Sequence, residues 1–398
     1  MTQTIAFSAL LWDLGKYAGV AAFFLLAFLI FSGDTARFWD KFIGLDKIIK
    51  FQKKFSYFVA VFVVLHPIFF ILSRGQVFNF IIPNFTYVPL ALGIIGFYIF
   101  VAVMIASALY KKISYKAWQY IHIGTYILFF FTLYHAINWG SDSDKLFVPY
   151  IITLALLIIG AIYRANYKLF KSNKFFVESI VEETHDTFTI NIKTDKPYKF
   201  KAGQFCFLRL DKNKLHARHP FTISSAPSEK NISFTIKNTG RFTETAKNLK
   251  AGDAISVDGP FGVFTPPNDG ELVFIAGGVG ITPFMSIIND RLKNGASQKI
   301  TLIYGSRNIK DIIFKKVFDS INQDWFKKVY VLSEDGDVVG FSYERGYVSR
   351  NIIEKYVKNI KDSMYYICGP ELMKNSIKKT LIELGVEKQN IFIEDFFW

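Results

Sequence analysis

Three of the six histidines lie inside long apolar runs of the sequence: His66, His122 and His135. Ionisable side chains are costly within a bilayer and usually face a functional interior of the protein. A histidine bonded to a neighbouring helix is the simpler interpretation of any one of them. Three histidines on two runs, with no other charged residue at that depth, instead favour haem b, whose iron takes an imidazole from each side.

The spacing of these histidines indicates how they pair. His122 and His135 are separated by 13 positions, which is ~20 Å along a helix at ~1.5 Å per residue. Depth, counted from the lysines that precede the two runs, pairs His66 with His135 toward the outer face and places Gln52 opposite His122. We therefore expect one haem between His66 and His135. A second haem is expected at His122, with its other ligand not identified.

Five apolar runs could carry these residues across a membrane, at about residues 15–31, 55–73, 86–109, 117–137 and 147–163. Each is close to the ~20 residues that a helix needs to span a bilayer. The composition, 51% hydrophobic and 17% aromatic, is that of a membrane protein rather than a soluble one. The segment 34–54 alternates charged and apolar residues and predicts an amphipathic helix at the membrane surface.

Basic residues gather at one end of the apolar runs and are rare at the other end. They gather before the second run, between the third and fourth, and after the fifth (Lys47, Lys50, Lys53, Lys54; Lys111, Lys112, Lys116; Arg164, Lys168, Lys171, Lys174). The loops 74–85 and 138–146 carry only Arg74 and Lys145. The positive-inside rule therefore predicts a multi-pass protein of the cell membrane with its C-terminal half in the cytoplasm. The net charge of +14 is explained by these flanks and gives no support to nucleic-acid binding.

The C-terminal half changes its hydrophobic period twice. From Phe175 onward, short alternating segments broken by turn residues predict a small antiparallel barrel. After Pro266 and Pro267, "ELVFIAGGVGITPF" (271–284) predicts a buried strand, a glycine-rich turn and a helix, with Thr282 as its cap and Pro283 in its first turn. Further apolar strands separated by helical stretches predict an α/β dinucleotide-binding layer. Its two cysteines indicate no disulfide framework.

Three motifs in this half occur in an informative order. They are "RHPFTISS" (218–225), "GGVGITPF" (277–284) and "YICGP" (366–370). They resemble the flavin, nicotinamide-nucleotide and Cys-Gly-Pro elements of ferredoxin–NADP reductase-type domains. With the histidine-bearing runs in front, the whole chain resembles membrane ferric reductases and NADPH oxidases, most of all a bacterial NADPH oxidase. In that family the second run carries two histidines, whereas here Gln52, a poor ligand for haem iron, stands at the inner position.

The resemblance implies an FAD site on the first motif. His219, Pro220, Phe221 and Thr222 would line the isoalloxazine, with the Thr222 hydroxyl at the flavin N5 edge where hydride arrives. Ser225 is placed at the same cofactor, and Arg218 would neutralise its pyrophosphate. In "NTGRFTETA" (238–246), Gly240 and Thr243 would begin a helix whose amides hold the same phosphates.

The resemblance also implies an NADPH site. Its residues would be Gly278, Gly280, Thr282 and Pro283 at the pyrophosphate, Arg307 at the 2′-phosphate, and Cys368, Gly369 and Pro370 near the nicotinamide. A solvated Arg307 and a merely buried Cys368 remain open as alternatives. A C-terminal aromatic, Phe397 or else Trp398, would cover the flavin face. Thr222, Cys368 and Phe397 are thus the expected catalytic residues.

Together these features predict a multi-domain membrane protein. It has an α-helical haem-binding transmembrane bundle (1–170), an antiparallel β-barrel FAD domain (171–266) and an α/β NADPH-binding domain (267–398). Electrons would pass from cytosolic NADPH through FAD and haem to a small acceptor outside, dioxygen with superoxide as product. The alternatives are a ferric-chelate reductase and an electron-relay component that serves a periplasmic reductase. No obligatory cytosolic activator is evident in the sequence.

Overall fold

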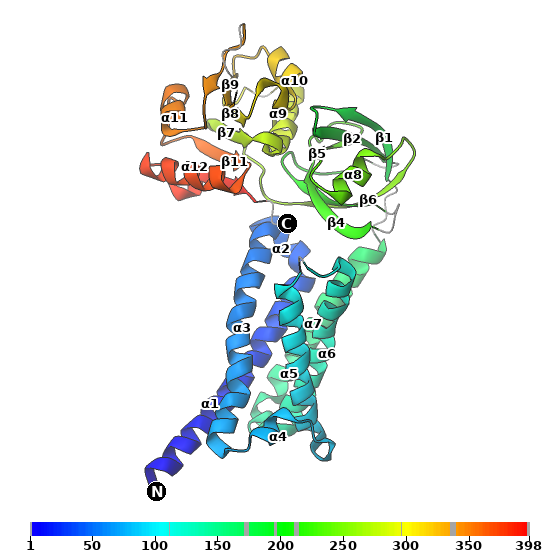
Figure 1. The fold of residues 1–398 in the computed structure, drawn as a ribbon, viewed down its shortest axis with the longest axis vertical. Helices are drawn as coiled ribbons and strands as arrows, with labels where there is room; N and C mark the ends of the chain where they lie inside the picture. Colours follow the sequence, from blue (N-terminus) through cyan, green and yellow to red (C-terminus); the bar gives the residue numbers. More distant parts are fainter. Residues whose placement is uncertain are drawn as a thin grey trace. The chain divides into compact units, whose positions relative to one another are not determined.

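The fold comes from a computed structural model, which describes residues 2–395 apart from 111, 171–174, 195–196, 211–214, 296 and 335–339. The chain divides into two compact units, Met1–Ser172 and Asn173–Trp398. The first is helical and the second combines an antiparallel with a parallel sheet (Figure 1).

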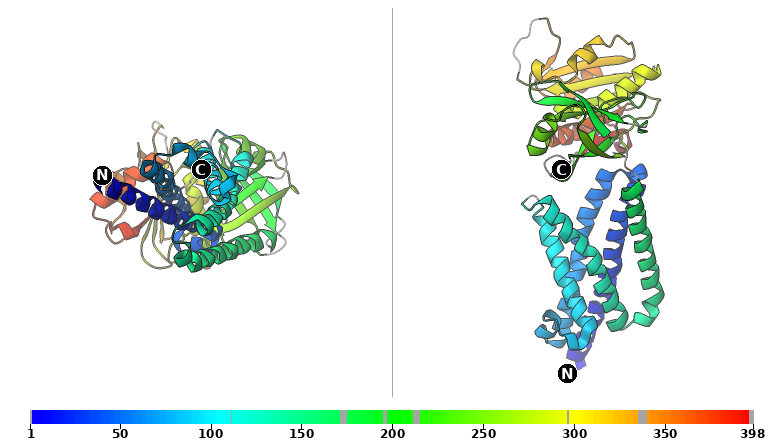
Figure 2. Two further views of the ribbon diagram at one scale, coloured as in Figure 1. Left: turned by 90° about the horizontal axis from the view of Figure 1, so that it is seen from below. Right: turned by 90° about the vertical axis from the view of Figure 1, so that its right-hand side faces the viewer.

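Within the described residues, the first unit has five helices long and apolar enough to cross a membrane. They belong to α1 (Thr2–Asp34), α3 (Leu45–Arg74), α5 (Val88–Ala108), α6 (Tyr115–Trp139) and α7 (Ser143–Phe170). Two short helices, α2 (Ala36–Ile43) and α4 (Val77–Ile81), lie between the long ones. Helix α1 packs along α3, and α5 packs along α6 (Figures 1 and 2). The structure thus confirms the five predicted spans.

The segment predicted as one amphipathic helix over 34–54 is divided instead. Gly44 adopts a φ of 92°, which ends α2 and starts α3. The Asp40 carboxylate accepts a hydrogen bond of 2.7 Å from the amide of Leu45, the first residue of α3, which has no partner within the helix. Only α2 is a separate amphipathic segment, with Phe38, Trp39 and Phe42 exposed. The lysine-rich remainder is continuous with the second span, because nothing after Gly44 interrupts the helix.

The second unit begins with six antiparallel strands in the order β4-β3-β6-β1-β2-β5. They are β1 (Phe175–Glu182), β2 (Thr187–Thr194), β3 (Phe205–Leu210), β4 (Leu215–Thr222), β5 (Ile232–Lys237) and β6 (Ala254–Phe261), with α8 (Arg241–Lys247) after β5. A bridge between Ile223 and Phe234 joins the two edge strands. Alternate side chains meet in a core that includes Phe188, Ile190 and Phe234.

The remaining strands form a parallel sheet in the order β10-β9-β8-β7-β11-β12. They are β7 (Leu272–Gly277), β8 (Ile300–Ser306), β9 (Phe326–Leu332), β10 (Glu344–Arg345), β11 (Met364–Cys368) and β12 (Ile391–Glu394). The helices between them are α9 (Thr282–Asn294), α10 (Lys315–Ser320), α11 (Arg350–Tyr356) and α12 (Glu371–Glu383). Every residue of β7 is buried, as expected of a central parallel strand.

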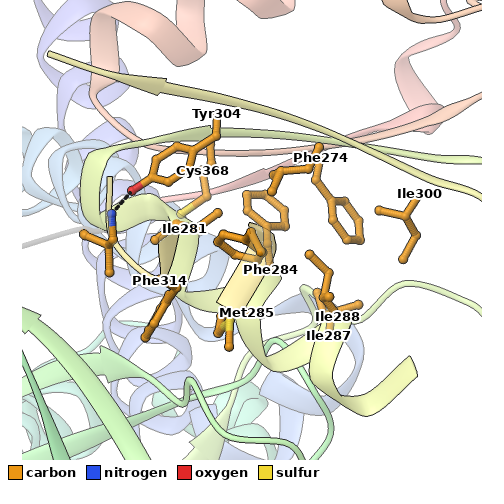
Figure 3. Packing of buried hydrophobic residues seen from close by; sticks show 14 of the residues in the cluster. Phe274, Ile281, Phe284, Met285, Ile287, Ile288, Ile300, Tyr304, Phe314 and Cys368 are labelled. Carbon is orange, nitrogen blue, oxygen red and sulfur yellow. Dashed lines mark hydrogen bonds between the residues drawn. The ribbon is translucent and has the colours of Figure 1, made fainter. Parts of the chain in front are cut away.

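Hydrophobic clusters cover both faces of this parallel sheet. One joins Phe274 and Tyr304 of the sheet to Phe284 of α9 (Figure 3). The other joins Ile275 and Ile367 to Ile353 of α11 and Leu381 of α12. In open α/β sheets of this kind, ligands bind outside the carboxyl ends of the strands. The predicted nucleotide motifs follow β7, β8 and β11 at this edge.

Candidate redox sites

Two of the three membrane histidines face each other. His66 of α3 and His135 of α6 have ring centroids 6.1 Å apart, with their planes at 80°. Imidazole nitrogens bind transition metals at about 2 Å, so one metal atom between two rings puts their centroids on the order of 6 Å apart. The observed spacing therefore fits an iron atom held from both sides.

Two glycines of α1 orient His66. Its Nδ1 lies 2.8 Å from the carbonyl oxygen of Gly15. A Cβ on Gly19 would lie only 2.5 Å from the same ring, so the ring rests against bare backbone. Gly15 and Gly19 are four positions apart and share one face of the helix. We call this pair, a carbonyl and a glycine one turn later, a glycine notch.

A second glycine notch, on α5, orients His135. Its Nδ1 lies 3.0 Å from the carbonyl oxygen of Pro89, and a Cβ on Gly93 would lie 2.6 Å from Nδ1. Histidines that bind metals usually donate their other ring N–H to such an acceptor, which fixes the tautomer and orientation. In both histidines, donation from Nδ1 leaves Nε2 as the nitrogen for a ligand. The glycines of the two notches were not predicted from the sequence.

His122 has a different environment. Its Nδ1 is buried and has no hydrogen-bond partner in the described part of the chain. Its ring stacks on Trp118 at 4.4 Å and 26°. Gln52, which was expected opposite it, donates from Nε2 to the Ser32 hydroxyl at 3.0 Å. Among the residues that the structure describes, His122 thus lacks both the acceptor and the partner imidazole that His66 and His135 have.

An ion pair with a buried carboxylate joins three helices of the same unit. The Asp34 carboxylate is 4% exposed and accepts hydrogen bonds from the Tyr126 hydroxyl at 2.6 Å and from Arg164 at 2.9 Å. Its second oxygen, Oδ2, is buried without a partner among the described residues. Asp34 ends α1, Tyr126 lies on α6 and Arg164 on α7, so the cluster fixes these helices together. The sequence interpretation missed it because its members are far apart in the chain.

The first soluble motif forms β4 and the turn after it. Arg218 makes an ion pair of 2.9 Å with Asp258 and lies over the Phe207 ring. His219 and Phe221 both pack on Phe242 of α8, at centroid distances of 4.1 and 5.8 Å. The Arg218 side chain remains about half exposed, and its guanidinium has more donors than Asp258 uses, so it retains donors for a phosphate.

Thr222 and the serines after it differ in what their hydroxyls bind. Thr222 is 3% exposed, and its hydroxyl makes no hydrogen bond to the described residues. The Ser224 hydroxyl accepts from Thr235 at 3.0 Å, and the Ser225 hydroxyl accepts from the Ser233 amide at 3.0 Å. As acceptors, the two serine hydroxyls stabilise the barrel, and each keeps its own hydrogen to donate. The Thr222 hydroxyl has both its donor and its acceptor sites left for a ligand.

Gly240 and Thr243 build the turn before α8. The Thr243 hydroxyl accepts from the amides of Thr239 and Gly240, each at 3.0 Å, and donates back to the Gly240 carbonyl at 2.8 Å. Its bonds therefore shape the turn. A Cβ on Gly240 would meet nothing within 4 Å, so open space borders this backbone.

The pH dependence of stability should report on His219. Burial lowers its pKa below the ordinary value. Between the folded pKa and about 6.5, the unfolded chain binds more protons than the folded one, so stability rises with pH through this window. We expect the parent to lose more thermal stability than His219→Gln as the pH falls from about 7 to about 5. Melting curves at saturating FAD measure this, and parallel losses in both proteins would refute it.

The glycine-rich turn after β7 is constrained by its neighbours. Gly278 has a φ of 54° and open space beside it. A Cβ on Gly280 would lie 2.3 Å from the Cys368 carbonyl oxygen, so this glycine permits the close approach of the β11 turn. Thr282 is the first residue of α9 and not its cap, because its hydroxyl donates back to the Val279 carbonyl at 3.1 Å. Pro283 lies in the first turn, as predicted.

Cys368 lies inside the hydrophobic cluster beneath this turn, near Ile281 and Tyr304 (Figure 3). It is fully buried, and burial raises the pKa of its thiol well above the usual value. The side chain is therefore a neutral thiol at physiological pH. Gly369, with a φ of 157°, and Pro370 pack against Gly277 and carry the backbone past the end of β7.

Arg307 follows β8 at the carboxyl edge of the parallel sheet. Its side chain is 73% exposed, with Glu334 3.8 Å away. An exposed cation there is accessible to a phosphate, while the carboxylate beside it opposes one. The expected flavin-covering aromatics, Phe397 and Trp398, lie outside the described residues. Asp395, just before them, pairs with the buried Lys374 of α12.

Three segments match known protein families. Residues 18–133 match the ferric reductase like transmembrane component. Residues 172–265 match an FAD-binding domain, and residues 274–379 match an oxidoreductase NAD-binding domain. The chain carries the domains of a membrane flavin-dependent oxidoreductase. The three ranges lie within the three domains expected from the sequence.

Curated relatives are similar to part of this oxidoreductase. One component of the Na(+)-translocating NADH-quinone reductase of Methylococcus capsulatus is 35% identical over 156 residues, which cover 37% of this chain and 38% of that protein. Its counterpart in a Marinomonas species is 32% identical over 217 residues, covering 50% and 52%. This chain therefore spans about half, or less, of the length of these relatives.

Solved structures resemble the soluble part of the oxidoreductase in fold. The Amycolatopsis cytochrome P450 reductase GcoB aligns with a TM-score of 0.51 at 24% identity, over 56% of this chain and 69% of that chain. A ferredoxin NADP+ reductase from Neisseria gonorrhoeae with bound FAD and NADP aligns with a TM-score of 0.50 at 20% identity, over 57% and 98%. At these identities the likeness concerns the fold alone.

Proposed function

We propose that this protein carries electrons from NADPH, through FAD and b-type haem, across the cell membrane to dioxygen, with superoxide as product. The observation that carries the proposal is the pair His66 and His135, 6.1 Å apart and each oriented through Nδ1 by a helix carbonyl. When bound, FAD accepts hydride from a nicotinamide and releases single electrons, which haem iron can pass on.

The chain's own residues would bind and orient these groups. The Thr222 hydroxyl would meet the flavin N5 edge, and Arg218, positioned by Asp258, would meet the FAD pyrophosphate. The open space beside Gly278 would admit the pyrophosphate of the nucleotide. We include Pro220, Phe221 and His219 at the flavin, and Gly369 and Pro370 at the nicotinamide. Cys368, as a buried neutral thiol, would support this turn through packing.

Two further parts of the proposal rest on charge. The basic residues that flank the helices favour a cytoplasmic location for the soluble unit, by the positive-inside rule. Of the two outer loops, 138–146 offers Asp142 and Asp144 as its acidic residues, and Lys145 pairs with Asp142 at 3.2 Å. Such a loop would attract a metal chelate only weakly. This favours dioxygen as the electron acceptor. Ferric-chelate reduction is the second candidate, favoured by the ferric reductase-like match.

Purified protein in detergent tests the proposal. We would supply FAD and either NADPH or NADH in air, follow cytochrome c reduction with and without superoxide dismutase, and record the reduced-minus-oxidised haem spectrum. Fast reduction that the dismutase abolishes is the expected result. Reduced haem without dismutase-sensitive reduction would exclude dioxygen as the acceptor and direct the assay to ferric chelates. Comparing the rates with NADPH and NADH would show whether Arg307 attracts the 2′-phosphate of NADPH or Glu334 repels it.

Replacing Thr222 by valine should slow flavin reduction while FAD stays bound. The substitution keeps the shape of a buried side chain and removes one hydroxyl. Loss of one hydrogen bond in the reacting complex costs about 1 kcal/mol or somewhat more, which is about a tenfold lower rate. Stopped-flow reduction by NADPH, at matched FAD content, measures it. Equal rates in variant and parent would remove Thr222 from the site.

A further inference from the structure

We infer that the membrane unit holds a single haem, between His66 and His135, and that His122 is not a haem ligand. The inference rests on the proposed haem function and limits it. It changes the expectation that His122 carries a second haem, because the residues around it do not fit that group.

The first argument is the hydrogen bonding of His122. A metal-bound histidine coordinates through one nitrogen and donates from the other. If Nε2 of His122 bound iron, its Nδ1–H would be buried with no acceptor among the described residues, at a cost of about 1–3 kcal/mol. If Nδ1 bound iron, the metal would need space beside an atom that the protein already encloses. Neither arrangement resembles those of His66 and His135.

The second argument is the residue that lies across from His122. Gln52 is the residue that depth places across from His122, and its amide nitrogen is engaged with the Ser32 hydroxyl at 3.0 Å. Its remaining donor atom is an amide oxygen, which suits hard cations such as magnesium or calcium, whereas haem iron takes imidazole, thiolate, thioether or phenolate ligands. Iron at this depth would therefore lack the second ligand that the outer pair supplies.

The third argument is the surface of the neighbouring helices. Each histidine of the outer pair rests in a glycine notch with less than 3 Å between its ring and the position of an added Cβ. The glycines nearer the inner site border other residues. A Cβ on Gly124 would meet Ile99 at 3.6 Å, and one on Gly33 would meet Gln52 at 3.8 Å. His122 instead has its ring face stacked on Trp118.

Haem stoichiometry tests this inference directly. Cells would be grown with added haemin, and the purified full chain would be titrated with haemin to saturation, so that incomplete loading does not imitate a single site. Haem per chain would then be measured as the pyridine haemochromogen. A ratio of one is expected, with a single one-electron wave in a redox titration. A ratio of two would overturn the inference and leave the proposed function standing.

Three variants assign the site. His122→Ala and the more conservative His122→Gln should both keep the haem content of the parent. His135→Ala should lose it, and NADPH-dependent ferricyanide reduction would show that its soluble unit is still folded. If both His122 variants lose half of the haem while His135→Ala keeps the other half, the inference fails. A parent that binds no haem at saturation but reduces ferricyanide would refute the haem step of the proposed function, and this inference with it.

Discussion

Replacing Gly93 by alanine is expected to remove most of the haem that we propose between His66 and His135. The new Cβ would lie 2.6 Å from Nδ1 of His135 and 2.9 Å from two of its ring carbons. The ring cannot keep its place, and moving it breaks the bond from Nδ1 to the Pro89 carbonyl. Changes to such supporting contacts typically weaken metal binding by about 10–100-fold. Haem content and a haemin titration of the purified variant measure the effect.

The controls for Gly93→Ala separate this clash from a general effect on the helices. Alanine favours a helix over glycine by about 1 kcal/mol, so a weakened helix does not explain a loss. Gly19→Ala should act in the same way through His66, because its Cβ would lie 2.5 Å from that ring. Gly124→Ala, whose Cβ would only touch Ile99 at 3.6 Å, should bind haem like the parent. A Gly93→Ala protein with the parent's haem affinity would contradict the proposed site.

Gly280→Ala is expected to unfold or severely weaken the soluble unit. Its Cβ would lie 2.3 Å from the carbonyl oxygen of Cys368 and 2.8 Å from the Gly369 amide nitrogen. These are backbone atoms, which cannot rotate away as a side chain would, so the turns after β7 and β11 must separate. We expect a loss of about 3 kcal/mol or more, at the upper end of overpacking effects. Flavin release on heating, followed by fluorescence, measures it.

A glycine on the adjacent strand supplies the matched control for Gly280→Ala. Gly305 of β8 lies beside Gly277 in the sheet, and a Cβ there would make contacts of 3.5 Å or more. Gly305→Ala should therefore melt close to the parent. If Gly280→Ala also melted close to the parent, the close approach between the two turns would not be a constraint on the fold.

Much of the architecture could be predicted because it depends on local patterns. Apolar runs of membrane length indicated the five long helices, and the change from alternating to buried strands indicated the change from antiparallel to parallel sheet. The proximity of His66 and His135 followed from counting depth along two helices of the same direction. In each case the information lies in the length, period or spacing of a local pattern in the sequence.

Other features depend on contacts between distant segments, which one sequence does not show. Nothing near His66 in the chain indicates that Gly15 and Gly19 receive its ring, since these are 51 and 47 positions away. Ser225 is expected at the cofactor, and the sequence alone does not show that its hydroxyl also accepts a hydrogen bond from the Ser233 amide. The division at Gly44 depends on one positive φ angle that an amphipathic pattern does not reveal.

The two glycine notches have a consequence for how the membrane unit would acquire the haem that we propose for it. Each imidazole is oriented by its own helix pair, α1 with α3 and α5 with α6, through atoms of the protein alone. The ligand geometry is therefore settled when the chain folds, and little side-chain entropy remains to be lost on binding. The haem would then bind to a preformed site. The folded apoprotein should accept it after translation, with an affinity that depends on the preorganised ligands and not on folding coupled to binding.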